Sequence, residues 1–159
     1  MIVTISTPEE MGELGAAIAR QLRAGDLIAL DGELGAGKTT FTRGLGEQLR
    51  VRGAVTSPTF VLARTHPRPD GPPLVHVDAY RLGSPAELDD LDIDFERSIV
   101  VVEWAAGMLD GVTEDWLALH ITRPRGAETA EDGVEPRIVE ITPHGERWSG
   151  VDLPGIKLA

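Results

Sequence analysis

The fold of this chain is decided by the stretch Leu27-Ile28-Ala29-Leu30-Asp31-Gly32-Glu33-Leu34-Gly35-Ala36-Gly37-Lys38-Thr39. Its first four residues are apolar and have the character of a buried strand. Residues 32–39 then match the complete Gly-x-x-x-x-Gly-Lys-Thr pattern of a phosphate-binding loop. After the loop, Phe41, Leu45 and Leu49 recur at four-residue spacing, as one face of a helix requires. Strand, glycine loop and helix in this order form the context in which such a motif marks a phosphate site.

Each residue type in the loop has a task in binding phosphate. Glycines let the backbone turn tightly and bring its N–H groups onto phosphate oxygens with no Cβ in the way. The start of the following helix adds unsatisfied donors and the positive end of its dipole. Lys38 can reach the β- and γ-phosphates, and the Thr39 hydroxyl can take one place in the Mg²⁺ shell. The predicted nucleotide-binding residues of the loop are Gly32, Gly35, Ala36, Gly37, Lys38, Thr39 and Thr40.

The composition limits what kind of protein this is. At 159 residues it is long enough for one domain with a core of its own, and without Cys it has neither disulfides nor thiolate metal sites. The net charge of −11 argues against direct nucleic-acid binding, because phosphate backbones need basic faces. The sequence shows no signal-peptide pattern and no apolar run as long as a membrane span. We therefore expect a cytoplasmic protein that makes no membrane contact.

The spacing of apolar residues predicts strands and helices in mixed order. Thr7 caps a helix that begins at Pro8 and that Gly25 ends. The most apolar run, 98–103, predicts a central parallel strand that is buried on both faces. The other expected elements are an edge strand at 2–4, a loop at 57–60 entering a hairpin with its return strand at 74–78, a short helix from 85, strands at 116–122 and 137–142, a mobile loop at 123–136 and an irregular tail at 145–159. We expect one α/β domain over residues 1–159, a three-layer P-loop NTPase domain with a mixed parallel and antiparallel sheet.

A P-loop nucleotidase needs a second magnesium partner, usually an acid at the end of an apolar strand near the loop. Glu103 ends the more apolar strand, whereas Asp78 ends strand 74–78 and is the more usual residue type. One of the two acids would hold the metal and the other would orient water, and we favour Thr39 with Glu103 as the metal ligands. The predicted catalytic residues are Lys38, Asp78 and Glu103.

Two further candidate site residues, Thr59 and Trp104, each have two interpretations. Thr59 lies in the segment that senses the γ-phosphate in P-loop switch proteins, but it is equally compatible with an ordinary turn. Trp104, beside Glu103, either stacks on a base or packs as core. His76 and His120 lack metal-ligand spacing, and we interpret them as structural histidines.

Four segments together resemble the TsaE family (earlier YjeE), the bacterial ATPases of tRNA threonylcarbamoyladenosine biosynthesis. These segments are Gly32-Glu33-Leu34-Gly35-Ala36-Gly37-Lys38-Thr39-Thr40-Phe41-Thr42-Arg43-Gly44, Ser57-Pro58-Thr59-Phe60, His76-Val77-Asp78-Ala79-Tyr80-Arg81-Leu82 and Val102-Glu103-Trp104. They follow the family's order and spacing, and the likeness covers residues 1–122. The chain departs from the family at Glu33, at Ala79 and in the long acidic segment 123–136.

The resemblance implies a Mg²⁺-dependent ATPase, with ATP and Mg²⁺ as cofactors, that works inside an assembly. Its partners would be TsaD, which transfers the threonylcarbamoyl group, and TsaB, and these proteins rather than this chain would hold the tRNA. The product would be the modified adenosine beside the anticodon of tRNAs that read codons beginning with A, and ATP binding and hydrolysis would drive turnover. The family also places its N-terminal segment beside the base, so Thr7 either borders the nucleotide or only caps its helix.

Two arginines stand out near the matched motifs. Arg43 falls about one turn into the helix after the loop and should point away from the γ-phosphate. Arg81 could serve the site or a partner surface. Because neither arginine is an evident source of positive charge at the γ-phosphate, a partner could supply it. We therefore expect slow hydrolysis by the chain alone and faster hydrolysis with its partners.

Two functions from other classes compete with this interpretation. One is a stand-alone P-loop kinase acting on a small molecule, although 159 residues leave little room for a lid or an acceptor site. The other is a nucleotide-dependent switch module, which in its GTP-binding form needs an Asn-Lys-x-Asp segment that the sequence lacks.

Overall fold

The computed structural model describes residues 1–33, 35–53, 55, 62–123 and 136–150. Its elements are β1 (Ile2–Ile5), α1 (Pro8–Ala19), β2 (Leu27–Gly32), α2 (Lys38–Leu49), β3 (Ala63–His66), β4 (Leu74–Asp78), α3 (Pro85–Asp89), β5 (Ile99–Glu103), β6 (Trp116–Thr122), β7 (Arg137–His144) and the 3-10 turn η1 (Glu146–Trp148). Within the described residues, seven strands form one sheet in the order β1-β7-β6-β2-β5-β4-β3.

The centre of the sheet is parallel and its two edges are antiparallel. Strand β2 pairs in parallel with both β5 and β6, and β4 pairs in parallel with β5. The outer pairs β1–β7, β6–β7 and β3–β4 are antiparallel. Every residue of β5 is buried, as the apolar run 98–103 predicted for a central strand.

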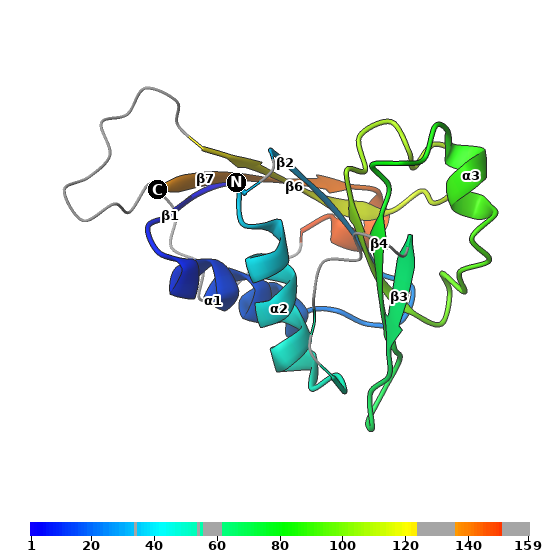
Figure 1. Ribbon diagram of the computed structural model, residues 1–159, viewed down its shortest axis with the longest axis horizontal. Coiled ribbons are helices and arrows are strands. Elements are labelled where there is room, and N and C mark those ends of the chain that lie inside the picture. The colour runs from blue at the N-terminus through cyan, green and yellow to red at the C-terminus, as the bar shows by residue number, and fades with distance from the viewer. Residues whose placement is uncertain (34, 54, 56–61, 124–135, 151–159) are drawn as a thin grey trace.

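Layers cover both faces of this sheet. Alternate residues of β2 point to opposite faces, so Ile28 and Leu30 join a core cluster with α1 and α2, whereas Leu27 and Ala29 join a second cluster with Leu88 of α3. Figure 1 shows α1 and α2 together beneath the strands, with α2 and α3 on opposite sides of β4. The predicted three-layer α/β architecture with a mixed sheet is therefore confirmed.

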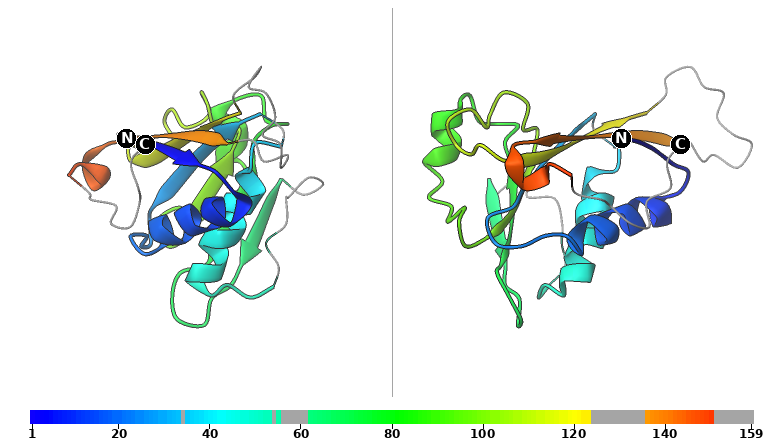
Figure 2. Two further views of the ribbon diagram at one scale, coloured as in Figure 1. Left: turned by 90° about the vertical axis from the view of Figure 1, so that its left-hand side faces the viewer. Right: turned by 180° about the vertical axis from the view of Figure 1, so that it is seen from behind.

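Helices α1 and α2 meet backbone to backbone. A Cβ on Gly15 would lie 2.2 Å from the Phe41 carbonyl oxygen, and a Cβ on Gly44 would lie 2.2 Å from the Gly12 carbonyl oxygen. Such distances leave no space for a side chain on either helix at these points. The left view of Figure 2 shows the crossing of the two helices below the sheet. This contact fixes α2, and with it the end of the glycine loop, against the N-terminal part of the chain.

The first helix is shorter than predicted. It ends at Ala19 rather than at Gly25, and Arg20 caps it by donating its N–H to the carbonyl of Ala16. The carboxylate of Asp26 accepts a hydrogen bond from Arg23 N at 2.8 Å, which gives the backbone here a local alternative to the helix. Gly25, with φ +94°, serves the turn into β2 instead of the helix end.

The segment expected to be an irregular tail carries an anchored turn at its start. Trp148 of η1 is 2% exposed in the core, and Arg147 forms two hydrogen bonds with the buried carboxylate of Asp26, at 2.8 and 3.0 Å. The right view of Figure 2 shows η1 against the loop that follows α1. The side chains that fix this turn are long-range partners, so local periodicity could not reveal it. Residues 151–159 and most of the expected mobile loop, 124–135, lie outside the described residues.

Candidate nucleotide-binding site

The loop after β2 has the backbone shape that its glycines permit. Gly35 has φ +79°, and Gly37, the N-cap of α2, has φ +112°, a region that side-chain-bearing residues rarely adopt. A Cβ on Gly32 would lie 2.9 Å from the carbonyl oxygen of Ile121 on β6. The turn inside the loop is closed by a hydrogen bond from Ala36 N to Glu33 O at 3.0 Å. The loop thus delivers the chain directly from the central strand into the N-terminus of α2, where donors for an anion are available.

Lys38 is held inside this loop by backbone carbonyls at the end of β2 and the start of the loop. Its Nζ donates to Gly32 O at 2.5 Å and to Glu33 O at 3.2 Å, and it lies 4.0 Å from the ring centroid of Trp104. Burial lowers the pKa of Lys38 from 10.5, while the charges of nearby carboxylates, Glu103 foremost, oppose that shift. A phosphate group would therefore stabilise the positive charge of Lys38 that burial disfavours.

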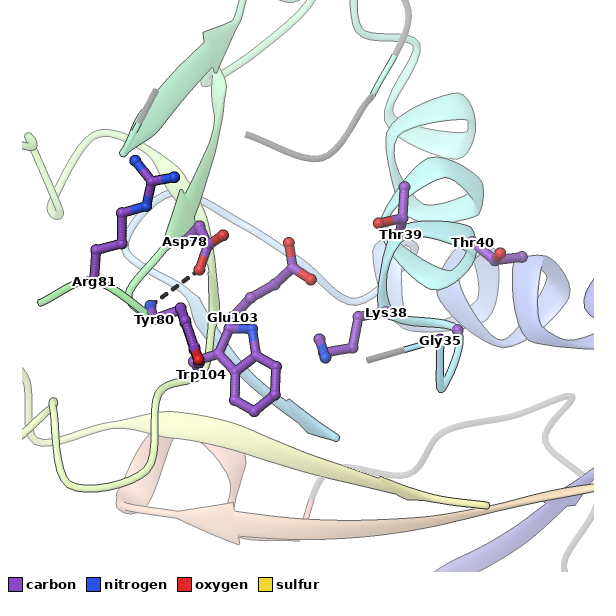
Figure 3. A pocket seen from close by; sticks show the side chains of 10 residues that line it. Gly35, Lys38, Thr39, Thr40, Asp78, Tyr80, Arg81, Glu103 and Trp104 are labelled. Carbon is purple, nitrogen blue, oxygen red and sulfur yellow. Dashed lines mark hydrogen bonds between the residues drawn. The ribbon is translucent and has the colours of Figure 1, made fainter. Parts of the chain in front are cut away.

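Asp78 and Glu103 lie side by side at the carboxyl ends of β4 and β5. The two residues are direct register partners in the parallel ladder, so both acids reach the same edge of the sheet. Glu103 is buried, whereas Asp78 is half-buried and its Oδ1 accepts a hydrogen bond from Tyr80 N at 3.0 Å. Figure 3 shows the Glu103 carboxylate pointing toward the first turn of α2, where Lys38 and Thr39 lie. The structure therefore brings the predicted catalytic residues together.

A hollow of about 560 Å³ lies between the loop and these acids. Its lining residues are Gly35, Gly37, Lys38, Thr39, Thr40, Asp78, Tyr80, Arg81, Glu103 and Trp104. Hydroxyl and carboxylate oxygens are the ligands that Mg²⁺ prefers, and this ion usually takes only one or two carboxylates together with phosphate oxygens. No cluster of three or more His, Asp or Glu suited to a metal exists in the described part of the chain. The donor set therefore suits a metal held jointly with a nucleotide.

A second hollow, of about 290 Å³, adjoins the first and shares Gly35, Gly37 and Thr40 with it. Thr7 lines this space, and its Oγ1 accepts the capping hydrogen bond from Glu10 N at 3.1 Å. The N-cap of α1 is thus both a cap and a wall beside the glycine loop. That Thr7 also borders the nucleotide stays a prediction.

Two arginines that the sequence did not single out approach the loop. Arg137 lines the second hollow and its Nε donates to Ala36 O at 3.2 Å. A Cβ on Gly35 would lie 3.4 Å from Nη1 of Arg123. Both arginines reach the loop only through the pairing of β6 and β7, so no local signal in the sequence could identify them. The expectation that Arg43 and Arg81 are the arginines to consider is therefore too narrow.

The remaining candidates lie where their elements place them. Trp104 has φ +58°, and its ring lies 5.2 Å from that of Tyr80, so it lines the hollow instead of packing as core. Arg81 is exposed and points away from Glu103 in Figure 3. Arg43 is exposed and lines a different hollow, next to Glu47, as expected of a residue that points away from the loop. Thr59 and the rest of 57–60 lie outside the described residues.

His76 is a buried histidine that contacts one of the two predicted acids. Its ring is fully buried, and its Nε2 lies 2.6 Å from Oε2 of Glu103. Its burial agrees with the interpretation as a structural histidine, and its partner is the predicted catalytic acid Glu103. His120, which was given the same interpretation, is exposed on β6.

The fold and the loop define the class of protein first: this is an α/β protein of the P-loop NTPase kind. A family model described as "Threonylcarbamoyl adenosine biosynthesis protein TsaE" matches residues 5–130. The chain therefore belongs to the TsaE family, as its motifs indicated.

Individual relatives agree with this assignment. The tRNA threonylcarbamoyladenosine biosynthesis protein TsaE of Streptomyces coelicolor is 59% identical over 147 residues, which cover 90% of this chain and 97% of that protein. The protein of the same name from Bacillus subtilis is 34% identical over 143 residues, which cover 89% and 84% of the two chains. The crystal structure of YdiB from Bacillus subtilis matches with a TM-score of 0.72 at 31% identity, covering 93% of this chain and 88% of that one. No helix among the described residues combines the length and the apolar character needed to cross a membrane.

Proposed function

We propose that this protein is a Mg²⁺-dependent ATPase that acts in the threonylcarbamoyladenosine modification of tRNA. The observation that carries the proposal is the shared hollow in which Lys38 and the helix N-terminus face Asp78 and Glu103. A glycine loop alone would support nucleotide binding, whereas acids at the ends of two adjacent strands add groups that can bind a metal and orient water. The modification pathway comes from the family, whose curated members are named for it.

The nucleotide's β- and γ-phosphates would lie against the loop N–H groups and the first turn of α2. Lys38 would exchange the carbonyl oxygens of Gly32 and Glu33 for phosphate oxygens. Pairing with the negative phosphate would offset the free-energy cost of burying the ammonium charge. The adenine would take the second hollow beside Thr7, because the family places its N-terminal segment next to the base.

Thr39 and Glu103 are the residues we assign to hold the metal, and Asp78 the residue we assign to orient the attacking water. When bound, Mg²⁺ would supply positive charge against the phosphate oxygens. Burial and direction support this assignment of roles: Glu103 is 4% exposed and points at the first turn of α2, whereas Asp78 is half-buried.

The assembly we propose contains the partners TsaD and TsaB, with tRNA held by them and not by this acidic chain. Arg81 lines the hollow but points away from Glu103, which supports the proposal that it meets a partner at the rim of the site. A partner that supplies or redirects positive charge could raise the hydrolysis rate by roughly 10³–10⁵ in the manner of other P-loop enzymes. We therefore expect the chain alone to bind ATP and hydrolyse it slowly.

Lys38→Ala is the variant that tests this proposal. Losing a charge-assisted contact of about 1.5–3 kcal/mol should weaken ATP binding roughly 10- to 150-fold, with the fold intact. Arg43→Ala, on the exposed side of the same helix, is the matched control and should bind as the wild type does. Calorimetric titration with Mg²⁺-ATP measures affinity, and phosphate release with and without TsaD and TsaB measures turnover.

Three results would contradict the proposal. Wild-type affinity in the Lys38 variant would remove the phosphate-loop assignment. Fast hydrolysis by the isolated chain, unchanged by TsaD and TsaB, would indicate a self-sufficient nucleotidase. Phosphate transfer to a small acceptor would instead indicate a kinase.

A further inference from the structure

His76 and Glu103 form a buried polar pair directly behind the proposed site. His76 lies in the middle of β4 with 0% of its surface exposed, and Glu103 at the end of β5 is 4% exposed. The 2.6 Å between His76 Nε2 and Glu103 Oε2 is short for a hydrogen bond with a nitrogen donor. With the proton on Nε2, the ring donates to the carboxylate.

The pairing leaves the carboxylate with two unlike oxygens. Oε2 is held by the ring, which leaves Oε1 as the oxygen available to a further partner in the hollow that Glu103 lines. A glutamate at a strand end has three rotatable side-chain bonds, and a fixed partner removes most of that freedom. The neighbouring acid has a comparable arrangement, because Oδ1 of Asp78 accepts a hydrogen bond from Tyr80 N and Oδ2 is left for another partner.

The surroundings of His76 argue that this bond has a purpose beyond packing. Its Nδ1 is buried and has no hydrogen-bond partner among the described residues. Burying a polar ring with one unpaired nitrogen costs free energy that an apolar side chain of similar size would not cost. Valines and leucines fill the neighbouring positions of β4 and β5, so an apolar residue at 76 would suit the core.

We infer that His76 is a positioning residue, which holds Oε2 of Glu103 so that Oε1 is aimed at the Mg²⁺-nucleotide. The inference rests on the proposed function, because it assigns Glu103 a task at the site. It resembles the way in which hydrogen-bond partners behind metal-binding side chains orient their ligands, an effect worth about 10–100-fold in activity or metal affinity. His76 itself touches neither nucleotide nor metal in this arrangement.

Three variants at this position separate positioning from packing. His76→Met keeps volume and removes the donor, and we expect turnover to fall by about 10–100-fold and the Mg²⁺ concentration for half-maximal turnover to rise. ATP affinity should stay within about threefold of the wild type, because the phosphate loop is untouched. His76→Gln places an amide N–H near the position of Nε2 and should recover most of the turnover. His76→Asn is too short to reach Oε2 and should behave as the Met variant does, which keeps the test available if the Met variant fails to fold.

The assays use the full chain together with TsaD and TsaB. Calorimetry gives the ATP affinity, phosphate release gives the turnover as a function of Mg²⁺, and circular dichroism confirms the fold. In a Glu103→Gln background, His76→Met should cause no further loss, because the two changes act on one interaction. His120→Met, on an exposed histidine, is the control and should change neither readout.

Wild-type turnover and Mg²⁺ dependence in the folded Met or Asn variant would overturn the inference. Equal losses in the Gln and Met variants, or losses that add in the double variant, would also overturn it and leave His76 with a packing role. Failure of the proposed function looks different: the wild-type chain itself would then show no ATP turnover with its partners.

Discussion

Gly15→Ala should destabilise this protein, although alanine favours helices. A Cβ at this position would lie 2.2 Å from the carbonyl oxygen of Phe41 and 2.9 Å from the backbone nitrogen of Leu45. Both atoms belong to the backbone of α2, so no flexible side chain can move aside. The methyl group has space only if α1 and α2 separate by about 1 Å, which opens the core beside the helices.

The size of the effect follows from two opposing contributions. Overpacking a tight contact costs about 1–3 kcal/mol, and a rigid backbone on the far side places this site at the upper end. Replacing a helical glycine by alanine returns about 1 kcal/mol of helix propensity. The net loss should therefore be about 2 kcal/mol, which for a domain of this size lowers Tm by roughly 4–8 °C.

Gly12→Ala, one turn earlier on the same helix, is the matched control. Its Cβ would meet only the Cα of Gly44, at 4.0 Å, which is ordinary contact. Here the propensity gain is unopposed, so we expect about 0.5–1 kcal/mol of added stability. Urea unfolding followed by circular dichroism measures both variants, and their slopes against urea should match that of the wild type. Equal effects of the same sign in the two variants would refute the described helix contact.

Three further results should follow from the structure. Arg147→Met leaves the buried carboxylate of Asp26 without its guanidinium, and should cost about 3 kcal/mol in urea unfolding, whereas Arg97→Met at an exposed ion pair should stay within about 0.5 kcal/mol. Burial lowers the pKa of His66 below 6.5, so the unfolded chain binds more protons in acid and the free energy of unfolding should fall as the pH drops through 6.5. His66→Leu should flatten the dependence of that free energy on pH, and an unchanged dependence would contradict this prediction. Burial also lowers the pKa of Lys38, and phosphate should raise it again, so ATP binding at about pH 9 should take up protons. Proton uptake makes the heat of binding depend on the ionisation enthalpy of the buffer, which calorimetry measures. Identical heats in all buffers would argue against the coupling of ATP binding to protonation of Lys38.

The elements that carry their own local signal were predictable from the sequence. Spacing and composition gave β2, the glycine loop and α2, because apolar periodicity and glycine chemistry act within a few residues. The all-apolar run of β5 likewise indicated a buried central strand. The predicted end of α1 lies too far toward the C-terminus, because the turn that replaces the last predicted helical residues depends on the side chain of Asp26.

What the sequence could not supply is the relation between strands. The patterns of β4 and β5 each placed an acid at a strand end, but only their register makes Asp78 and Glu103 direct neighbours. The same register brings His76 to Glu103 across 27 positions of sequence. Arg137 and Trp148 were also unpredictable from local sequence. The partner of Arg137 lies more than 100 positions away, and the neighbours of Trp148 are spread over the core.

The pairing of β1 with β7 imposes an order on assembly during synthesis. Met1 and Ile141, 140 positions apart, exchange two backbone hydrogen bonds. Among the described strands β1 is adjacent only to β7, so it gains this neighbour once β7 has left the ribosome. Closing a loop of that length is among the costliest steps in chain entropy and among the slowest in folding. Because α1 follows β1 directly, the wall that Thr7 contributes beside the glycine loop is fixed by the last strand in chain order that the structure describes. The part of the molecule that is made first is therefore among the last to take its final place.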